Sequence, residues 1–161
     1  MNRKLSRTIS AALFGALILP VALAGGSRVD LSTRRAIYVT HSTTAIDLKN
    51  DRYVAAGGTI TINRSQASGC EGNKCTFHLG IIAIKSGGSG PVSTYGQYTV
   101  QALGLTGNTI SFADTENTKE QVLPVKLAIG KNLVTFAIDP AKKIVETDET
   151  NNSMTVTIVV E

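Results

Sequence analysis

The sequence predicts an all-β protein, a sandwich of about seven antiparallel strands. Apolar residues recur at every second position in several runs, which is the period of a strand with one buried face. The two clearest runs lie near the C-terminus and comprise Val134, Phe136 and Ile138, then Met154, Val156, Ile158 and Val160. No stretch after residue 24 keeps the 3.6-residue apolar period of a helix, and glycine-containing turn signals separate the runs. Short strands with turns between them are what a β-sandwich requires.

The alternation places the expected strands in order along the chain. We expect them at residues 35–40, 59–63, 76–84, 98–102, 109–112, 121–129, 133–139 and 153–160. Gly57-Gly58 leads into the second, Gly107-Asn108 separates the fourth from the fifth, and Gly130 begins the turn before the seventh. The apolar side of the sixth carries Leu123, Val125, Leu127 and Ile129. Pro124 on its other side lacks the N–H that a ladder needs and suits an edge strand or a bulge. The long segment 85–120 leaves the strand order there open.

The connection between the last two runs is acidic and has a distinctive order. Asp139-Pro140 is followed by residues 144–152, Ile-Val-Glu-Thr-Asp-Glu-Thr-Asn-Asn, and then by a Thr-rich strand. This order resembles the closing signature of the CARDB family, the cell-adhesion-related domain found in bacteria, and the resemblance is strongest over residues 123–160. It implies an immunoglobulin-like or fibronectin-like sandwich of seven strands, usually on an exported protein and without catalytic activity. We therefore expect one CARDB-like domain over residues 25–161.

The first 24 residues have the organisation of a secretory signal peptide. Basic residues near the start precede an apolar run from Ile9 to Leu23, and Ala22-Leu23-Ala24 supplies the small-x-small pattern that a signal peptidase cuts. A single membrane anchor is the alternative, but Pro20 interrupts the run, which is shorter than the roughly 20 residues of a spanning helix. We expect cleavage before Gly25, export to the periplasm, the extracellular space or the cell surface, and no membrane span afterwards.

Removal of the signal would change the charge of the chain. Three of the 16 Lys and Arg residues lie in it, which leaves 13 against 12 Asp and Glu, a net charge of +1. A nearly neutral chain argues against nucleic acid as a partner, because the apparent basic excess belongs largely to the signal. The remaining 137 residues suit a single domain with one core.

Cys70 and Cys75 are the two cysteines of the chain. In an oxidising exported compartment their spacing favours a disulfide that closes a small loop. A redox or metal role is the alternative, although thioredoxin-like motifs need two residues between the cysteines and metal sites usually need a C-x2-C pair or nearby histidines.

Residues suited to catalysis are few. His41 and His78 are the two histidines, and neither accompanies a local nucleophile motif, so we expect both to be solvated. The two could form a metal pair with a carboxylate only if their strands were neighbours. The segment 86–91, Ser-Gly-Gly-Ser-Gly-Pro, lacks the ending of a phosphate-binding loop and predicts a flexible connection between strands.

Oxygen-bearing side chains gather in the acidic connection: Asp139, Glu146, Asp148, Glu149, Asn151 and Asn152. Their order does not match the calcium loop with a bidentate Glu at its twelfth position. We expect Asp and Asn side chains there to accept backbone N–H groups and fix the connection. A weak calcium site of the exported type is the alternative, and no other cofactor is expected.

These observations predict an exported, non-enzymatic binding or adhesion-type module that recognises a protein or a cell-surface carbohydrate. The alternative is a small periplasmic accessory or assembly subunit that adds a strand edge to a partner sheet. An enzyme is disfavoured because so few acid and base groups are present.

Overall fold

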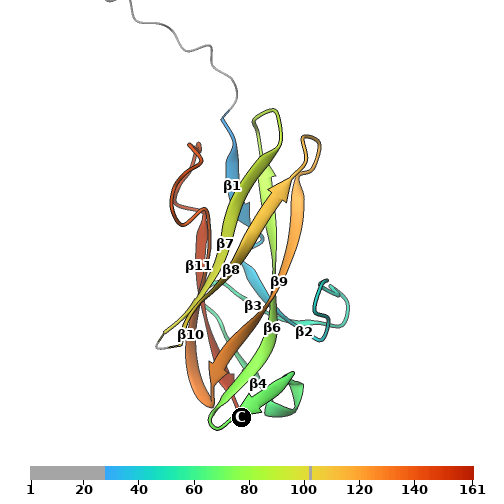
Figure 1. Cartoon of the computed structure of the whole chain (residues 1–161), viewed down its shortest axis with the longest axis vertical. Helices are drawn as coiled ribbons and strands as arrows, with labels where there is room; N and C mark the ends of the chain where they lie inside the picture. Colours follow the sequence, from blue (N-terminus) through green and yellow to red (C-terminus); the bar gives the residue numbers. More distant parts are fainter. Residues whose placement is uncertain (1–27, 102) are drawn as a thin grey trace, which may run out of the picture.

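The computed structural model describes residues 28–101 and 103–161, which form two facing β-sheets (Figure 1). The signal peptide expected over residues 1–24 lies outside them. The strands are β1 (Asp30–Thr33), β2 (Ala36–Thr40), β3 (Arg52–Ala55), β4 (Thr59–Ile62), β5 (Gly69–Glu71), β6 (Lys74–Ser86), β7 (Val92–Val100), β8 (Gly104–Phe112), β9 (Thr118–Ala128), β10 (Gly130–Ile138) and β11 (Ser153–Val160). A short 3-10 turn, η1 (Arg64–Gln66), follows β4. Within the described part of the chain, no helix is long and apolar enough to cross a membrane.

The first sheet is organised around the long strand β6. One side of β6 pairs with β9 from Lys74 to Ile84, and the other side pairs in turn with β5, β2 and β1. β3 extends the sheet beyond β2. β9 is therefore an edge strand, and Pro124 lies in it as the sequence predicts.

The second sheet has the order β4-β11-β10-β7-β8. All its pairs are antiparallel except β4 with β11, which is parallel, so the predicted antiparallel sandwich is confirmed with one parallel pair that the sequence did not predict. The cause is a crossing of the chain from the first sheet to the second between β3 and β4. Gly57 has a φ of 78°, a conformation that favours glycine, and β4 then enters beside the last strand in the same direction.

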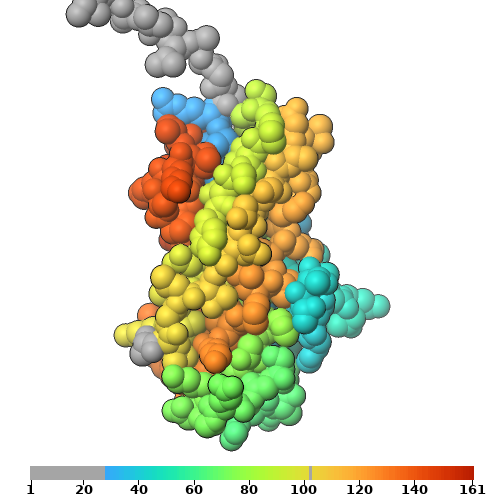
Figure 2. Space-filling view, in the orientation of Figure 1, coloured from blue at the N-terminus to red at the C-terminus, as the bar shows by residue number. Residues whose placement is uncertain are grey.

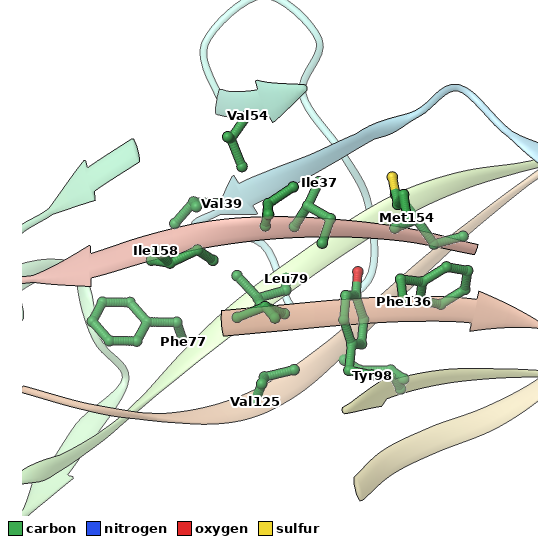
Figure 3. Close-up of a cluster of buried hydrophobic side chains, with 14 of the residues drawn as sticks. Ile37, Val39, Val54, Phe77, Leu79, Tyr98, Val125, Phe136, Met154 and Ile158 are labelled. Atoms are coloured by element: carbon green, nitrogen blue, oxygen red, sulfur yellow. The ribbon is translucent and has the colours of Figure 1, made fainter. Parts of the chain in front are cut away.

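The core lies between the sheets and is built by the predicted alternation. Phe77, Leu79, Val134, Phe136 and Ile138 are all completely buried. Tyr98 and Phe136 meet edge to face with ring centroids 5.0 Å apart (Figure 3). Each fully buried side chain of this size stabilises the fold by about 1.5–3 kcal/mol.

Several elements differ from the sequence expectations. β1, β3 and β5 were not expected, β7 begins six residues earlier than the expected strand at 98–102, and β8 begins five residues before 109–112. Ile129 lies outside β9 and is 38% exposed, so placing it on the apolar side was wrong. β9 ends before it because the chain turns into β10 at Gly130, whose φ is 92°.

The connection between β2 and β3 covers part of the outer face of the first sheet. Ile46 packs there in a small cluster with Ala36, Tyr38 and Ile82. A Cβ at Gly80 would lie 2.7 Å from Ile46, so the glycine makes room for this side chain. The Ile46 N–H also donates to the Glu120 carboxylate at 3.0 Å.

Candidate binding surface

The acidic connection between β10 and β11, residues 139–152, lies at one end of the sandwich beside β1 (Figures 1 and 2). Its first residue, Asp139, is buried and has a φ of 48°, which Asp tolerates better than most residues. Its two carboxylate oxygens accept from the Thr94 hydroxyl at 3.1 Å and from the Ile144 N–H at 2.8 Å. Its own N–H donates to the carbonyl of Tyr95 at 2.9 Å. Asp139 therefore fixes the start of the connection to β7.

Glu146 fixes the middle of the connection to β1. Its buried carboxylate accepts from the Leu31 N–H at 2.5 Å and from the Asn152 side-chain amide at 2.9 Å. Loss of solvation is the largest effect on this group and raises its pKa, assisted by the negative charges of Glu149 and Asp139, while the two hydrogen bonds oppose the rise.

Of the other acidic and amide residues of the connection, Asp148 is exposed, whereas Glu149 and Asn151 are half-buried. Asp148 accepts from the side chain and the N–H of Thr150, and these bonds lower its pKa. Glu149 lies 3.9 Å from the Lys142 ammonium. The Asn151 amide donates to the Asp30 carboxylate at 3.1 and 3.3 Å.

Asn152 differs from its expected role. Its side chain donates to Glu146, and its Oδ1 atom is buried without a hydrogen-bond partner in the described residues, whereas we expected it to accept a backbone N–H. Its donating role follows from the proximity of a carboxylate, which can only accept when ionised.

The arrangement does not gather carboxylates around a common point. Among residues 28–101 and 103–161, no three His, Cys, Asp or Glu side chains lie close enough together to hold a metal ion. Both oxygens of Asp139 and both of Glu146 are turned toward N–H or O–H donors of the protein.

A groove of about 440 Å³ opens where the acidic connection meets the outer side of β7 and β8. Such a volume lies within the roughly 300–1,000 Å³ typical of ligand sites. Its lining residues are Ser93, Thr94, Tyr95, Gln97 and Thr109 from the strands, and Asp139, Pro140, Ala141 and Lys143 from the connection. The wall formed by the connection is held in place by the hydrogen bonds of Asp139.

Tyr95 is the aromatic side chain of this groove. It pairs with Thr109 across β7 and β8, and it is 44% exposed. A Cβ built on Gly107 would lie 2.5 Å from Cε1 and 2.9 Å from Cζ of Tyr95, so the ring covers this glycine diagonally across the two strands. Glycine at 107 is what allows the ring to lie over the sheet.

Lys85 organises the loops at the same end of the sandwich. It is 3% exposed, and its ammonium donates to the carbonyls of Gly90, Ala113 and Asp114 at 3.2, 3.0 and 2.9 Å. These bonds join the 86–91 connection to the turn between β8 and β9. We did not predict this role of Lys85 from the sequence, although the residue continues the inward-facing series of Ile81 and Ala83 along β6.

The hairpin of β5 and β6 lies at the opposite end of the sandwich (green in Figure 1). Cys70 and Cys75 are joined across it by a disulfide, with Cα atoms 4.0 Å apart. The hairpin turns at Gly72, whose φ of 59° suits a two-residue turn. His41 is exposed, His78 is partly buried, and their strands are neighbours because Thr40 pairs with His78.

Comparisons with known proteins gave structural matches alone. No protein-family model and no curated protein matches the chain. A solution NMR structure of the CARDB domain of PF1109 from Pyrococcus furiosus is 16% identical, covers 83% of this chain and 95% of that chain, and has a TM-score of 0.45. A crystal structure of the same CARDB domain, in complex with di-metal ions, is 14% identical, covers 85% and 90%, and has a TM-score of 0.44. The N-terminal domain of PorA matches at 8% identity and a TM-score of 0.33, covering 83% of this chain and 98% of its own. CARDB domains, the family that residues 123–160 resemble, are thus among the solved structures similar to this chain.

Proposed function

We propose that this chain is a non-enzymatic binding module of the adhesion type, which takes its partner in the groove between the acidic connection and strands β7 and β8. One observation supports the proposal above all: the acidic connection, held by hydrogen bonds, forms one wall of a groove whose floor on the sheet carries the exposed ring of Tyr95. Binding residues commonly lie on loops and strand faces positioned by a rigid scaffold. The hydrogen bonds of the two buried residues Asp139 and Glu146 supply that rigidity, since they fix the connection to β7 and β1.

Export is part of the same proposal. The basic start, apolar run and Ala22-Leu23-Ala24 support removal of residues 1–24, and a disulfide between Cys70 and Cys75 suits an oxidising compartment. Intact-mass analysis of protein recovered from the periplasm or medium should give a chain beginning at Gly25. A chain of precursor mass retained in the membrane would contradict this part.

Photo-crosslinking tests where a partner binds. A photoreactive phenylalanine analogue placed at Gln97, in the groove, should give an adduct with a component of the cell envelope. The matched control carries the same analogue at Tyr53, an exposed tyrosine of the other sheet that is 63% exposed. Adducts from position 53 alone, or from neither position, would refute the assignment of the binding surface.

A further inference from the structure

We propose that the groove binds a neutral chain of pyranose sugars, with the ring of Tyr95 as the surface on which one sugar stacks. This inference rests on the proposed binding function and names its ligand class. It is carried by three features of the groove: the placement of the ring, the chemistry of its neighbours, and the low charge of the surrounding face.

The ring of Tyr95 is supported from beneath. Because Cε1 and Cζ occupy the space above Gly107, the ring rests on the backbone of β8, while 44% of the residue stays exposed. The face of an aromatic ring carries partial negative charge. The C–H groups on one side of a pyranose carry partial positive charge and are apolar enough to lie against such a face. A supported, exposed ring therefore offers a ready stacking surface.

Uncharged polar groups surround the ring. Gln97 and Thr109 line the groove, and neither side chain makes a hydrogen bond to another part of the described chain. An amide and a hydroxyl each donate and accept, which matches the hydroxyl groups of a sugar. Ser93 adds a second hydroxyl, which shares a 3.1 Å contact with Ser111.

The adjoining face is nearly free of charge and rich in threonine. On the strands of the second sheet, Lys131 is the one charged residue at the outward-facing positions. Thr99, Thr135 and Thr155 form a row across three adjacent strands, and the last two share a 2.8 Å contact between hydroxyls. An anionic polysaccharide or nucleic acid would need several cations for recognition. In the groove itself Asp139 is engaged with Thr94 and Ile144, which leaves Lys143 at the rim.

Titration of the ¹⁵N-labelled chain with defined hexasaccharides tests the inference. Cellohexaose and N-acetylchitohexaose serve as neutral probes, and hexagalacturonate serves as the anionic probe. At least one neutral probe should shift the amide resonances of Tyr95, Gln97 and Thr109. Tyr95→Ala should weaken that binding by at least about tenfold, while Tyr95→Phe should retain most of it.

Two controls separate loss of the ring from loss of the fold. Tyr53→Ala removes an exposed tyrosine from the other sheet and should leave the affinity unchanged. Gln97→Ala removes a hydrogen-bonding group at the groove and should weaken binding without removing the ring; thermal melts report on the folding of each variant.

The inference is overturned if neither neutral probe shifts the groove resonances, if hexagalacturonate alone binds there, or if Tyr95→Ala leaves the affinity unchanged. A protein adduct from position 97 together with no neutral saccharide binding would refute the sugar ligand and leave the binding function standing. If position 97 gave no adduct and no saccharide bound, both the proposed binding function and the sugar ligand would be refuted.

Discussion

Replacement of Asp139 by Ala is the perturbation that separates a structural role of the acidic connection from a metal-binding role. The carboxylate is buried and accepts two hydrogen bonds, one of them from the backbone N–H of Ile144. The residue also adopts a φ of 48°, which alanine tolerates poorly. Asp139→Asn is the matched variant, because Asn tolerates this backbone conformation and keeps one oxygen acceptor.

The expected loss follows from these two contributions. A buried donor left without an acceptor costs about 1–3 kcal/mol, and here the Ile144 N–H is that donor. The hydroxyl of Thr94 is less buried and can turn to water, so its contribution is smaller. The left-handed backbone adds about 1–2 kcal/mol for alanine. We therefore expect Asp139→Ala to lower the free energy of unfolding by about 3 kcal/mol, and Asp139→Asn by about 1 kcal/mol.

Urea unfolding of residues 25–161, followed by far-ultraviolet circular dichroism, measures both variants. Each protein is unfolded once in chelator and once in millimolar calcium. Equal losses in the two conditions are expected, because the oxygens of Asp139 are engaged by the protein. A loss for Asp139→Ala below about 1 kcal/mol would refute the hydrogen-bonding argument. If calcium stabilised the parent chain and neither variant, Asp139 would bind metal, and its structural role would be refuted.

Three further substitutions test other parts of the structure. Replacement of Cys70 and Cys75 together by Ser should cost at most about 3 kcal/mol and leave the fold intact, because the bridge closes a short loop; an unfolded double variant by circular dichroism would contradict this. Burial raises the pKa of Glu146 above its ordinary value of 4.5, so the folded chain holds this proton more tightly and stability falls as the pH rises through the folded pKa. Glu146→Gln should therefore flatten this decline in unfolding free energy at pH values above 4.5, and a slope equal to that of the parent chain would contradict the argument. Lys85→Met leaves three carbonyls without their donor and should cost about 2 kcal/mol, with faster hydrogen exchange over residues 86–91; unchanged exchange there would show that the ammonium does not hold the loops.

The parts of the fold that the sequence predicts are those with long, regular alternation. β10 and β11 follow the two-residue period closely because each buries one face in the core, and β6 does so except at its centre, where Gly80 and Ile82 are buried beneath Ile46 on the outer face. The sequence does not predict β1 and β5, because they have only four and three residues, too few to display a period. The sequence does not predict β3 either, because this strand lies at an edge and Val54 is its one buried residue.

The candidate site is also only partly predictable from the sequence. The acidic connection is recognisable from its composition and order, but its partners come from strands far away in the sequence. Leu31 lies 115 residues from Glu146, and Thr94 lies 45 residues from Asp139. No local pattern reveals such pairs, since they depend on the order of strands in the two sheets. The exposure of Tyr95 is likewise a product of pairing, because the glycine that the ring covers lies on the neighbouring strand.

The two anchoring carboxylates give the acidic connection a role in both sheets. Glu146 holds it to β1 of the first sheet, and Asp139 holds it to β7 of the second. The acidic connection thus runs across the open end of the sandwich from one sheet to the other. Its part nearest β7 forms one wall of the groove. Since the hydrogen bonds of Asp139 fix the wall, a ligand has little conformational freedom left to restrict, and preorganisation of this kind raises affinity. Removal of the Asp139 carboxylate should therefore weaken binding in the groove more than removal of the Glu146 carboxylate does. Asp139 lines the groove, whereas Glu146 holds the far part of the acidic connection to β1.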